Sequence, residues 1–200
     1  MYSKVLSAAV QGIDAYVVKV EIHLDPALYA YTTVGLPDNA VKESRERVSA
    51  AIKNSGFLFP SKKITVNLAP AGIRKEGASF DLPIALGLLA ATGQVSRERL
   101  SRFAVLGELA LDGTIRPIHG ALSIATHLIT RKLDKGLGNP DYNYMIRSVP
   151  QDRGETAPFH WYLSLVVRLS YAAGFELGSG MFINTTLPEE SARFLNRIEL

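Results

Sequence analysis

The residues whose types and spacing best suit chemistry lie in one short segment, Lys75 to Asp81, which reads KEGASFD. Ser79 stands directly before a strongly apolar run, so we expect it at the N-terminus of a helix, where free N–H groups and the helix dipole favour an anion. A small-anion or oxyanion site there is one hypothesis. The simpler interpretation, which we favour from these residues alone, is structural: Ser79 caps the helix, Gly77 allows a tight turn and Asp81 complements the dipole.

A serine nucleophile also needs a base. Lys75 could accept the Ser79 proton only if burial lowered its pKa. We expect the opposite, because Lys75 lies in a loop beside Glu76, whose carboxylate favours the charged ammonium. His119, which follows a predicted strand, is the other base to consider. A Ser-dependent peptidase that uses Ser79 with Lys75 or His119 is therefore an alternative function.

Several classes of chemistry are not expected in this chain. Cysteine is absent, which excludes disulfides, thiolate nucleophiles and Cys-based metal sites. The sequence has no GxxxxGK[ST] loop, so we expect no nucleotide hydrolysis. The four histidines, at positions 23, 119, 127 and 160, lack the spacing of metal ligands, so we expect no metal site. We therefore expect no cofactor and no nucleotide-hydrolysing activity in this chain.

Composition is typical of a globular protein. Apolar residues make up 47% of the 200 positions and charged residues 20%, enough to build a core. The longest uninterrupted apolar run, Leu82 to Ala91, is far shorter than the roughly 20 residues of a membrane span. The N-terminus shows no signal peptide. We expect a cytoplasmic protein of mixed α and β structure without a membrane partner.

Alternation of apolar and polar residues predicts the strands that must position the Ser79 segment. The first three follow one another through short connections, which favours an antiparallel meander. Asp112-Gly113 is typical of a hairpin turn between the last two. The expected strands are residues 4–10, 15–24, 28–35, 63–68, 103–111 and 114–118, with a further short one at Phe182-Ile183.

Helical spacing predicts two principal helices, 38–55 and 79–92, packed on the sheet. Asp38 is the expected N-cap of the first and Gly56 its C-terminal glycine. Pairs such as Glu43 and Arg47 are spaced i,i+4, which favours a solvated helix face. Further helices are expected at about 120–131, 158–173 and 188–195. The stretch 132–157, rich in Gly, Pro and Asn, is expected to be a surface loop.

The net charge of +3 permits contact with nucleic acid without arguing for it. No base-reading motif is present, so any contact with DNA should be weak, electrostatic and indifferent to sequence. The candidate contacts are Arg45, Arg47, Lys62, Lys63, Arg74 and Lys75.

Three long motifs, in order, resemble a known family. They are TTVGLPDNAVKESRERVSAAIKNSGF, KKITVNLAPAGIRKEGASFDLPIALGLLAATGQV and FAVLGELALDGTIRPIHGALSIA. Together they resemble the N-terminal domain of the ComM/YifB proteins, also called magnesium-chelatase-related or ChlI-like. The resemblance covers residues 1 to about 125, and AAGF and LPEESARFL resemble its continuation. It implies a single domain over 1–200 with an atypical insertion at about 126–171.

The resemblance also implies a fold and a catalytic state. The domain is similar to the Lon proteolytic domain, an α+β fold of the ribosomal protein S5 domain 2-like group with a mixed sheet and packed helices. KEGASFD matches the Lon nucleophile motif and places Ser79 at the nucleophile. The segment His119 to Leu122 matches the motif of the Lon catalytic lysine and places Leu122 at that lysine. The resemblance therefore implies a proteolytically silent relative.

Whole proteins of the family resemble AAA+ ATPases that form ring hexamers and act on DNA in competence and recombination. This implies that ATP and Mg²⁺ belong to an ATPase module that would follow Leu200. The implied partners are that module, sister subunits of the hexamer and DNA. The expected role is assembly of the ring or guidance of a DNA strand beside it.

Overall fold

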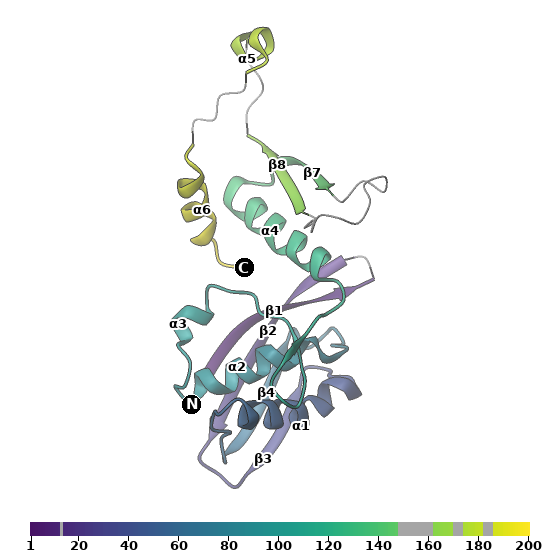
Figure 1. Ribbon diagram of the computed structural model, residues 1–200, viewed down its shortest axis with the longest axis vertical. Coiled ribbons are helices and arrows are strands. Elements are labelled where there is room, and N and C mark those ends of the chain that lie inside the picture. The colour runs from purple at the N-terminus through teal and green to yellow at the C-terminus, as the bar shows by residue number, and fades with distance from the viewer. Residues whose placement is uncertain (13, 148–161, 170–173, 182–185) are drawn as a thin grey trace, which may run out of the picture. The chain divides into compact units, whose positions relative to one another are not determined.

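The computed structural model describes residues 1–12, 14–147, 162–169, 174–181 and 186–200 (Figure 1). The chain divides into two compact units, Met1–Leu128 and Ile129–Leu200. The Ser79 segment lies in the first unit.

The first unit is built on a four-stranded mixed sheet in the order β1-β2-β4-β3. Its strands are β1 (Tyr2–Gln11), β2 (Asp14–Asp25), β3 (Ala30–Val34) and β4 (Lys63–Ala69). The pairs β1–β2 and β2–β4 are antiparallel, whereas β3 pairs with β4 in parallel. The predicted three-stranded meander is therefore wrong: β4 inserts between β2 and β3 because the intervening helix returns the chain to the same end of the sheet.

One face of this sheet carries the core. β4 alternates strictly, as does β2 from Val18 onward, and their inward side chains are almost fully buried. The outward positions are polar, among them Lys19, Glu21 and Asn67. Asn67 donates from Nδ2 to the Glu21 carboxylate at 2.7 Å, across neighbouring strands. The inward residues of the two strands are Val18, Val20, Ile22, Leu24, Ile64, Val66 and Leu68.

Two helices close the core: α1 (Asn39–Asn54) and α2 (Asp81–Ala91). α1 has a polar outer face, and its buried residues lie on one stripe that includes Val41, Val48 and Ile52. α2 is apolar on nearly every side and packs on β1 and β2. A Cβ at Gly87 would press into the side chains of Ile22 and Val5, so glycine allows the close approach of α2 to the sheet. Figure 1 shows both helices against the sheet of the first unit.

The remaining elements of the first unit are short. They are α3 (Arg97–Leu100), β5 (Glu108–Leu109) and β6 (Ile115–Arg116). The predicted strand 103–111 is thus reduced to two residues, although the segment before it touches β1, where the Val105 N–H donates to the Leu6 carbonyl at 2.8 Å. The predicted turn at Asp112-Gly113 is confirmed, with Gly113 at φ +91°. α4 (Ala121–Leu137) begins as predicted and continues past Arg131, so its last nine residues fall in the second unit.

The second unit also contains β7 (Asp141–Arg147), β8 (Tyr162–Arg168), α5 (Gly174–Ser179) and α6 (Pro188–Asn196). β7 and β8 pair as an antiparallel ribbon. The predicted helix 158–173 is therefore wrong over Tyr162–Arg168, where the β-branched pair Val166-Val167 favours a strand. The predicted loop 132–157 is wrong up to Arg147, while residues 148–157 and the expected strand at 182–183 lie outside the described residues. The last predicted helix is confirmed as α6.

Within the second unit, α6 and the segment after it pack on α4. The Lys132 ammonium donates to the Leu195 carbonyl at 3.1 Å, and the Lys135 ammonium to the Glu199 carbonyl at 2.9 Å. Gly136 faces Phe194 and Ile198 so closely that a Cβ would clash with the Ile198 side chain. Leu133 is buried in this unit. None of the described helices is long and apolar enough to cross a membrane.

Candidate functional site

Ser79 lies in a short 3-10 turn, Ala78–Phe80, immediately before α2. The turn is entered through Gly77 at φ +82°, a backbone conformation that favours glycine. The Ser79 carbonyl accepts from the Gly107 N–H at 3.0 Å. The side chain is half-buried, and within the described part of the chain its hydroxyl has no hydrogen-bond partner. The predicted N-cap role of Ser79 is wrong, because α2 begins at Asp81 and is preceded by Phe80, which makes no side-chain cap.

Asp38 holds the Ser79 segment against the start of α1. Its Oδ1 accepts from the Val41 N–H at 2.7 Å, which confirms the predicted N-cap. Its Oδ2 accepts from the Gly77 N–H at 3.1 Å. The backbones of Asp38 and Lys75 are also joined, since the Asp38 N–H donates to the Lys75 carbonyl at 2.9 Å. One carboxylate thus fixes both a helix terminus and the loop that carries Ser79.

Asp81 is fully buried and makes a two-point ion pair with Arg47 of α1. Arg47 Nε lies 2.6 Å from Oδ2 and Nη2 lies 3.0 Å from Oδ1. The Leu109 N–H of β5 donates to the same carboxylate at 3.3 Å. Burial raises the pKa of Asp81, and the Arg47 guanidinium and the Leu109 N–H oppose that rise. The predicted solvated pairing of Arg47 with Glu43 is therefore wrong: Arg47 reaches into the interior to neutralise a carboxylate.

Lys75 departs most from its predicted environment. Its side chain is fully buried, not mobile in an exposed loop. The ammonium donates to the Ile73 carbonyl at 2.6 Å and to the Pro70 carbonyl. Burial lowers the pKa of Lys75, so the expectation that Glu76 would hold it at its ordinary value is wrong. Glu76 instead pairs with Arg74 at 3.5 Å on the surface.

The other predicted participants do not converge on Ser79. His119 is exposed in the segment between β6 and α4. Leu122, at the position matched to the Lon lysine, is half-buried in the first turn of α4. Among the described residues, no hydrogen bond or ion pair joins Ser79 to Lys75 or His119. The segment therefore holds a hydroxyl and a buried amine that no hydrogen bond joins.

The predicted DNA contacts separate into two groups. Lys75 is buried and Arg47 is engaged by Asp81, so neither offers a free cation to a phosphate. The others reach the surface: Arg45, Lys62, Lys63 and Arg74. No cluster of three or more His, Asp or Glu side chains that could hold a metal occurs among the described residues.

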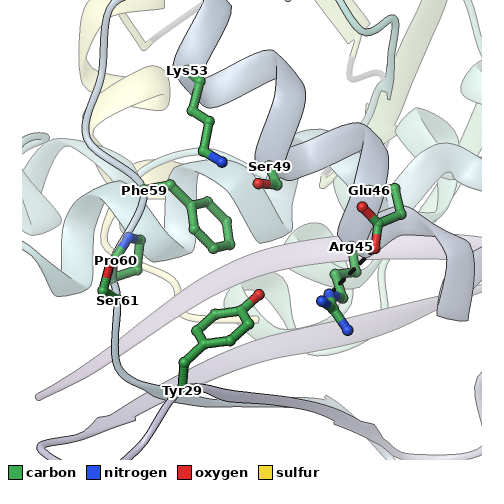
Figure 2. Close-up of a pocket in the computed structure, with 8 residues that line it drawn as sticks. All are labelled: Tyr29, Arg45, Glu46, Ser49, Lys53, Phe59, Pro60 and Ser61. Carbon is green, nitrogen blue, oxygen red and sulfur yellow. Dashed lines mark ion pairs between the residues drawn. The ribbon is translucent and has the colours of Figure 1, made fainter.

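Sequence reasoning missed a groove beside α1, with a volume of about 370 Å³. Arg45, Ser49 and Lys53 line one side at i,i+4,i+8 spacing on α1, and Figure 2 shows the rings of Tyr29 and Phe59 opposite them. The i,i+4,i+8 spacing was visible in the sequence. The partner rings were not, because they come from the loop before β3 and the segment before β4. The full lining is Tyr29, Arg45, Glu46, Ser49, Lys53, Phe59, Pro60 and Ser61.

Comparison with known proteins places the chain in a family. The family model described as subunit ChlI of Mg-chelatase matches residues 20–137. The YifB protein of Escherichia coli (strain K12) is 47% identical over 141 residues, which are 70% of this chain and 28% of that protein. The competence protein ComM of Haemophilus influenzae (strain ATCC 51907) is 48% identical over 118 residues, 59% of this chain and 23% of that protein. The chain spans less than a third of the length of these relatives. It belongs to the ChlI-like family that includes YifB and ComM.

Proposed function

We propose that this chain is a non-catalytic, Lon-like domain of a ComM-type AAA+ ATPase, with the S5 domain 2-like fold. Its role is to support ring assembly or to guide DNA beside the ring, in the cytoplasm and in competence or recombination. The ATPase module, sister subunits and DNA are its proposed partners. ATP and Mg²⁺ belong to that module. The name of the Haemophilus influenzae relative, a competence protein, supports this assignment.

One observation carries the non-catalytic part of the proposal: among the described residues, no base is placed to accept the proton of the Ser79 hydroxyl. The Lys75 ammonium is satisfied by the carbonyls of its own loop. The position matched to the Lon lysine is Leu122, whose alkyl side chain accepts no proton. Nucleophilic catalysis needs a base within hydrogen-bond distance of the hydroxyl. The arrangement supports a structural role for the Ser79 segment rather than a catalytic one.

A Ser-Lys peptidase remains the second candidate, because Lys75 meets one of its requirements. A lysine serves as a general base only when burial lowers its pKa, and Lys75 is buried with a lowered pKa. To reach Ser79, its ammonium would have to leave the Pro70 and Ile73 carbonyls. The small-anion hypothesis is less favoured, because the Asp81 carboxylate already stands in the first turn of α2, where it complements the helix dipole in place of an anion.

The deciding experiment incubates the protein with a fluorophosphonate probe and, separately, with unfolded casein. We expect no labelling and no cleavage. Ser79→Ala and Lys75→Met are the test variants, and Ser101→Ala, an exposed serine on the same unit, is the matched control. Probe labelling that Ser79→Ala abolishes and Ser101→Ala preserves would establish the peptidase and refute the non-catalytic domain.

A further inference from the structure

The groove beside α1 combines two aromatic rings with two cations, each cation placed over one ring. The Arg45 guanidinium carbon lies 5.6 Å from the centre of the Tyr29 ring, and the Lys53 ammonium 5.8 Å from the centre of the Phe59 ring. Both distances fall within the range of a cation–π contact. The groove therefore repeats one arrangement, a flat apolar surface beside a positive charge, at two points.

The positive charge of the groove is largely uncompensated. Within the part of the chain that the structure describes, the one ion pair of Arg45 is with Glu46, the next residue, at 3.4 Å with both side chains well exposed. Such a surface pair is weak and easily exchanged. Among the described residues, Lys53 has no acidic partner. Two cations against one carboxylate leave the groove with a net charge of about +1 and with donors free to meet an anion.

The shape and spacing suit a phosphate joined to a planar base. Arg45 and Lys53 are eight residues apart on α1, which separates them by about 12 Å along the helix axis, so each cation serves the ring beside it and the groove offers two such positions. The volume of about 370 Å³ falls in the range of small-ligand sites. Stacking on an aromatic ring is indifferent to which base is presented, because every base has a π face. The hydroxyls of Ser49 and Ser61 line the same groove and add hydrogen-bonding capacity.

We propose that this groove binds a nucleotide at its ring–cation pairs, with the base against the ring of one pair, Tyr29 or Phe59, and the phosphate at the cation of the same pair, Arg45 or Lys53. The nucleotide is either part of a single strand or free, and both sources share this chemistry. The inference deepens the proposed function and rests on it, because DNA is one of the proposed partners and the groove gives it a site outside the Ser79 segment. The two tests are independent. Absence of nucleotide binding would not change the result of the peptidase test, and peptidase activity would not exclude nucleotide binding at the groove.

The first experiment measures the affinity of the protein for a labelled oligothymidylate of about 12 nucleotides by fluorescence anisotropy. Tyr29→Ala and Lys53→Gln should each weaken binding at least about fivefold, the low end of a lost stacking contact. Both side chains are exposed, so the fold should survive. The matched control is Lys42→Gln, which removes an exposed charge from α1 outside the groove and should change the affinity less than about twofold.

The second experiment separates stacking from charge, and the strand from the free nucleotide. An abasic oligonucleotide of equal length should bind at least about fivefold more weakly, and Tyr29→Ala should not weaken it further. Thymidine monophosphate is then titrated while the amide signals of Ser49 and Ser61 are followed by NMR. Shifts with the oligonucleotide alone assign the site to a strand, and shifts with the mononucleotide assign it to a free nucleotide. Equal affinity for the abasic strand, an equal loss in Lys42→Gln, or no binding of either ligand would overturn the proposal.

Discussion

The guanidinium of Arg47 meets the carboxylate of Asp81 at two points, and this pair ties the middle of α1 to the first residue of α2. Arg47 also donates from Nη2 to the Ala40 carbonyl at 2.8 Å, so the arginine is held at both its own helix and its partner. Asp81 is fully buried, whereas the Arg47 side chain is 23% exposed. The partly exposed guanidinium of Arg47 therefore neutralises the carboxylate of Asp81, which has no access to water.

Loss of Arg47 should therefore be costly. Arg47→Ala leaves a buried carboxylate without its counter-ion and should destabilise the protein by about 3 kcal/mol or more. Adding Asp81→Asn to that variant removes the stranded charge and should recover part of the loss. Urea unfolding of the two variants measures both effects. Arg45→Ala, an exposed neighbour on α1, should cost less than about 1 kcal/mol, and an equal cost in the two arginine variants would contradict the role assigned to Arg47.

Lys75 should make stability depend on pH in a defined direction. Burial lowers the pKa of its ammonium in the folded state, so between that pKa and the unfolded value of about 10.4 the unfolded chain binds more protons. Stability should therefore rise with pH in this window. The measurement is the urea midpoint at several pH values between about 7 and 9.5, a range that lies below the pH at which tyrosines titrate. Lys75→Met should remove the rise, whereas Lys63→Met at an exposed site should retain it, and identical slopes in the two variants would refute the prediction.

Asp38→Ala should cost about 1–2 kcal/mol, the upper range of a lost N-cap, because it also removes the acceptor of the Gly77 N–H. Asp38→Asn keeps a single acceptor oxygen and should lie between the alanine variant and the parent protein. Amide exchange at Gly77 provides a local readout and should accelerate in Asp38→Ala. Unchanged exchange there would show that the loop is held by other contacts.

Ser79→Ala should change stability by less than about 0.5 kcal/mol, because the hydroxyl has no hydrogen bond to lose. A capping serine would instead cost about 1 kcal/mol. Thermal or urea unfolding distinguishes the two values. Ser96→Ala is the matched comparison, since Ser96 does cap a helix and accepts from the Arg99 N–H at 3.3 Å. A larger loss at position 79 than at position 96 would mean that Ser79 has a structural partner after all.

Gly35→Ala should be among the most damaging single-methyl additions. Gly35 has φ +98°, and a Cβ there would collide with the backbone carbonyl of Leu68. Gly93 has a similar φ of +78° with open space around it. Gly93→Ala should therefore cost about 1–2 kcal/mol for the backbone conformation alone, and Gly35→Ala at least about 2 kcal/mol more. Urea midpoints of the two variants test this, and equal losses would exclude the predicted collision.

The sequence predicts local features of this fold well. Asp38 as a cap and Gly56 as a C-terminal glycine depend on backbone needs within one helical turn, and both are confirmed. The alternation of β4, and of β2 from Val18 onward, likewise reports burial of one face. The order of the strands is harder to predict from the sequence, because nothing in the residues of β3 distinguishes β2 from β4 as its partner. The type of element is also uncertain at Tyr162–Arg168, because the spacing of its apolar residues fits both a helix and a strand.

The Ser79 segment was recognised from the sequence, and its environment was not. Asp81 and Arg47 are 34 residues apart, so their pairing depends on how two helices cross. A lysine is among the residues least often buried, which made an exposed Lys75 the natural expectation. Its burial depends on carbonyls that a loop happens to direct inward. The groove at Tyr29 was missed for the same reason, because three separate segments form it.

The order of the sheet has a consequence for self-association. β1 and β3 are the outer strands, and unpaired outer strands are templates for aggregation. On one side, the Ala104–Val105 segment occupies the hydrogen-bonding groups near Leu6. On the other side, β3 is only five residues long and ends at Val34, three residues before Pro37. A second chain therefore has few free backbone groups to pair with, because β1 is partly paired already and β3 is short. We expect this to protect the sheet against growth into fibrils.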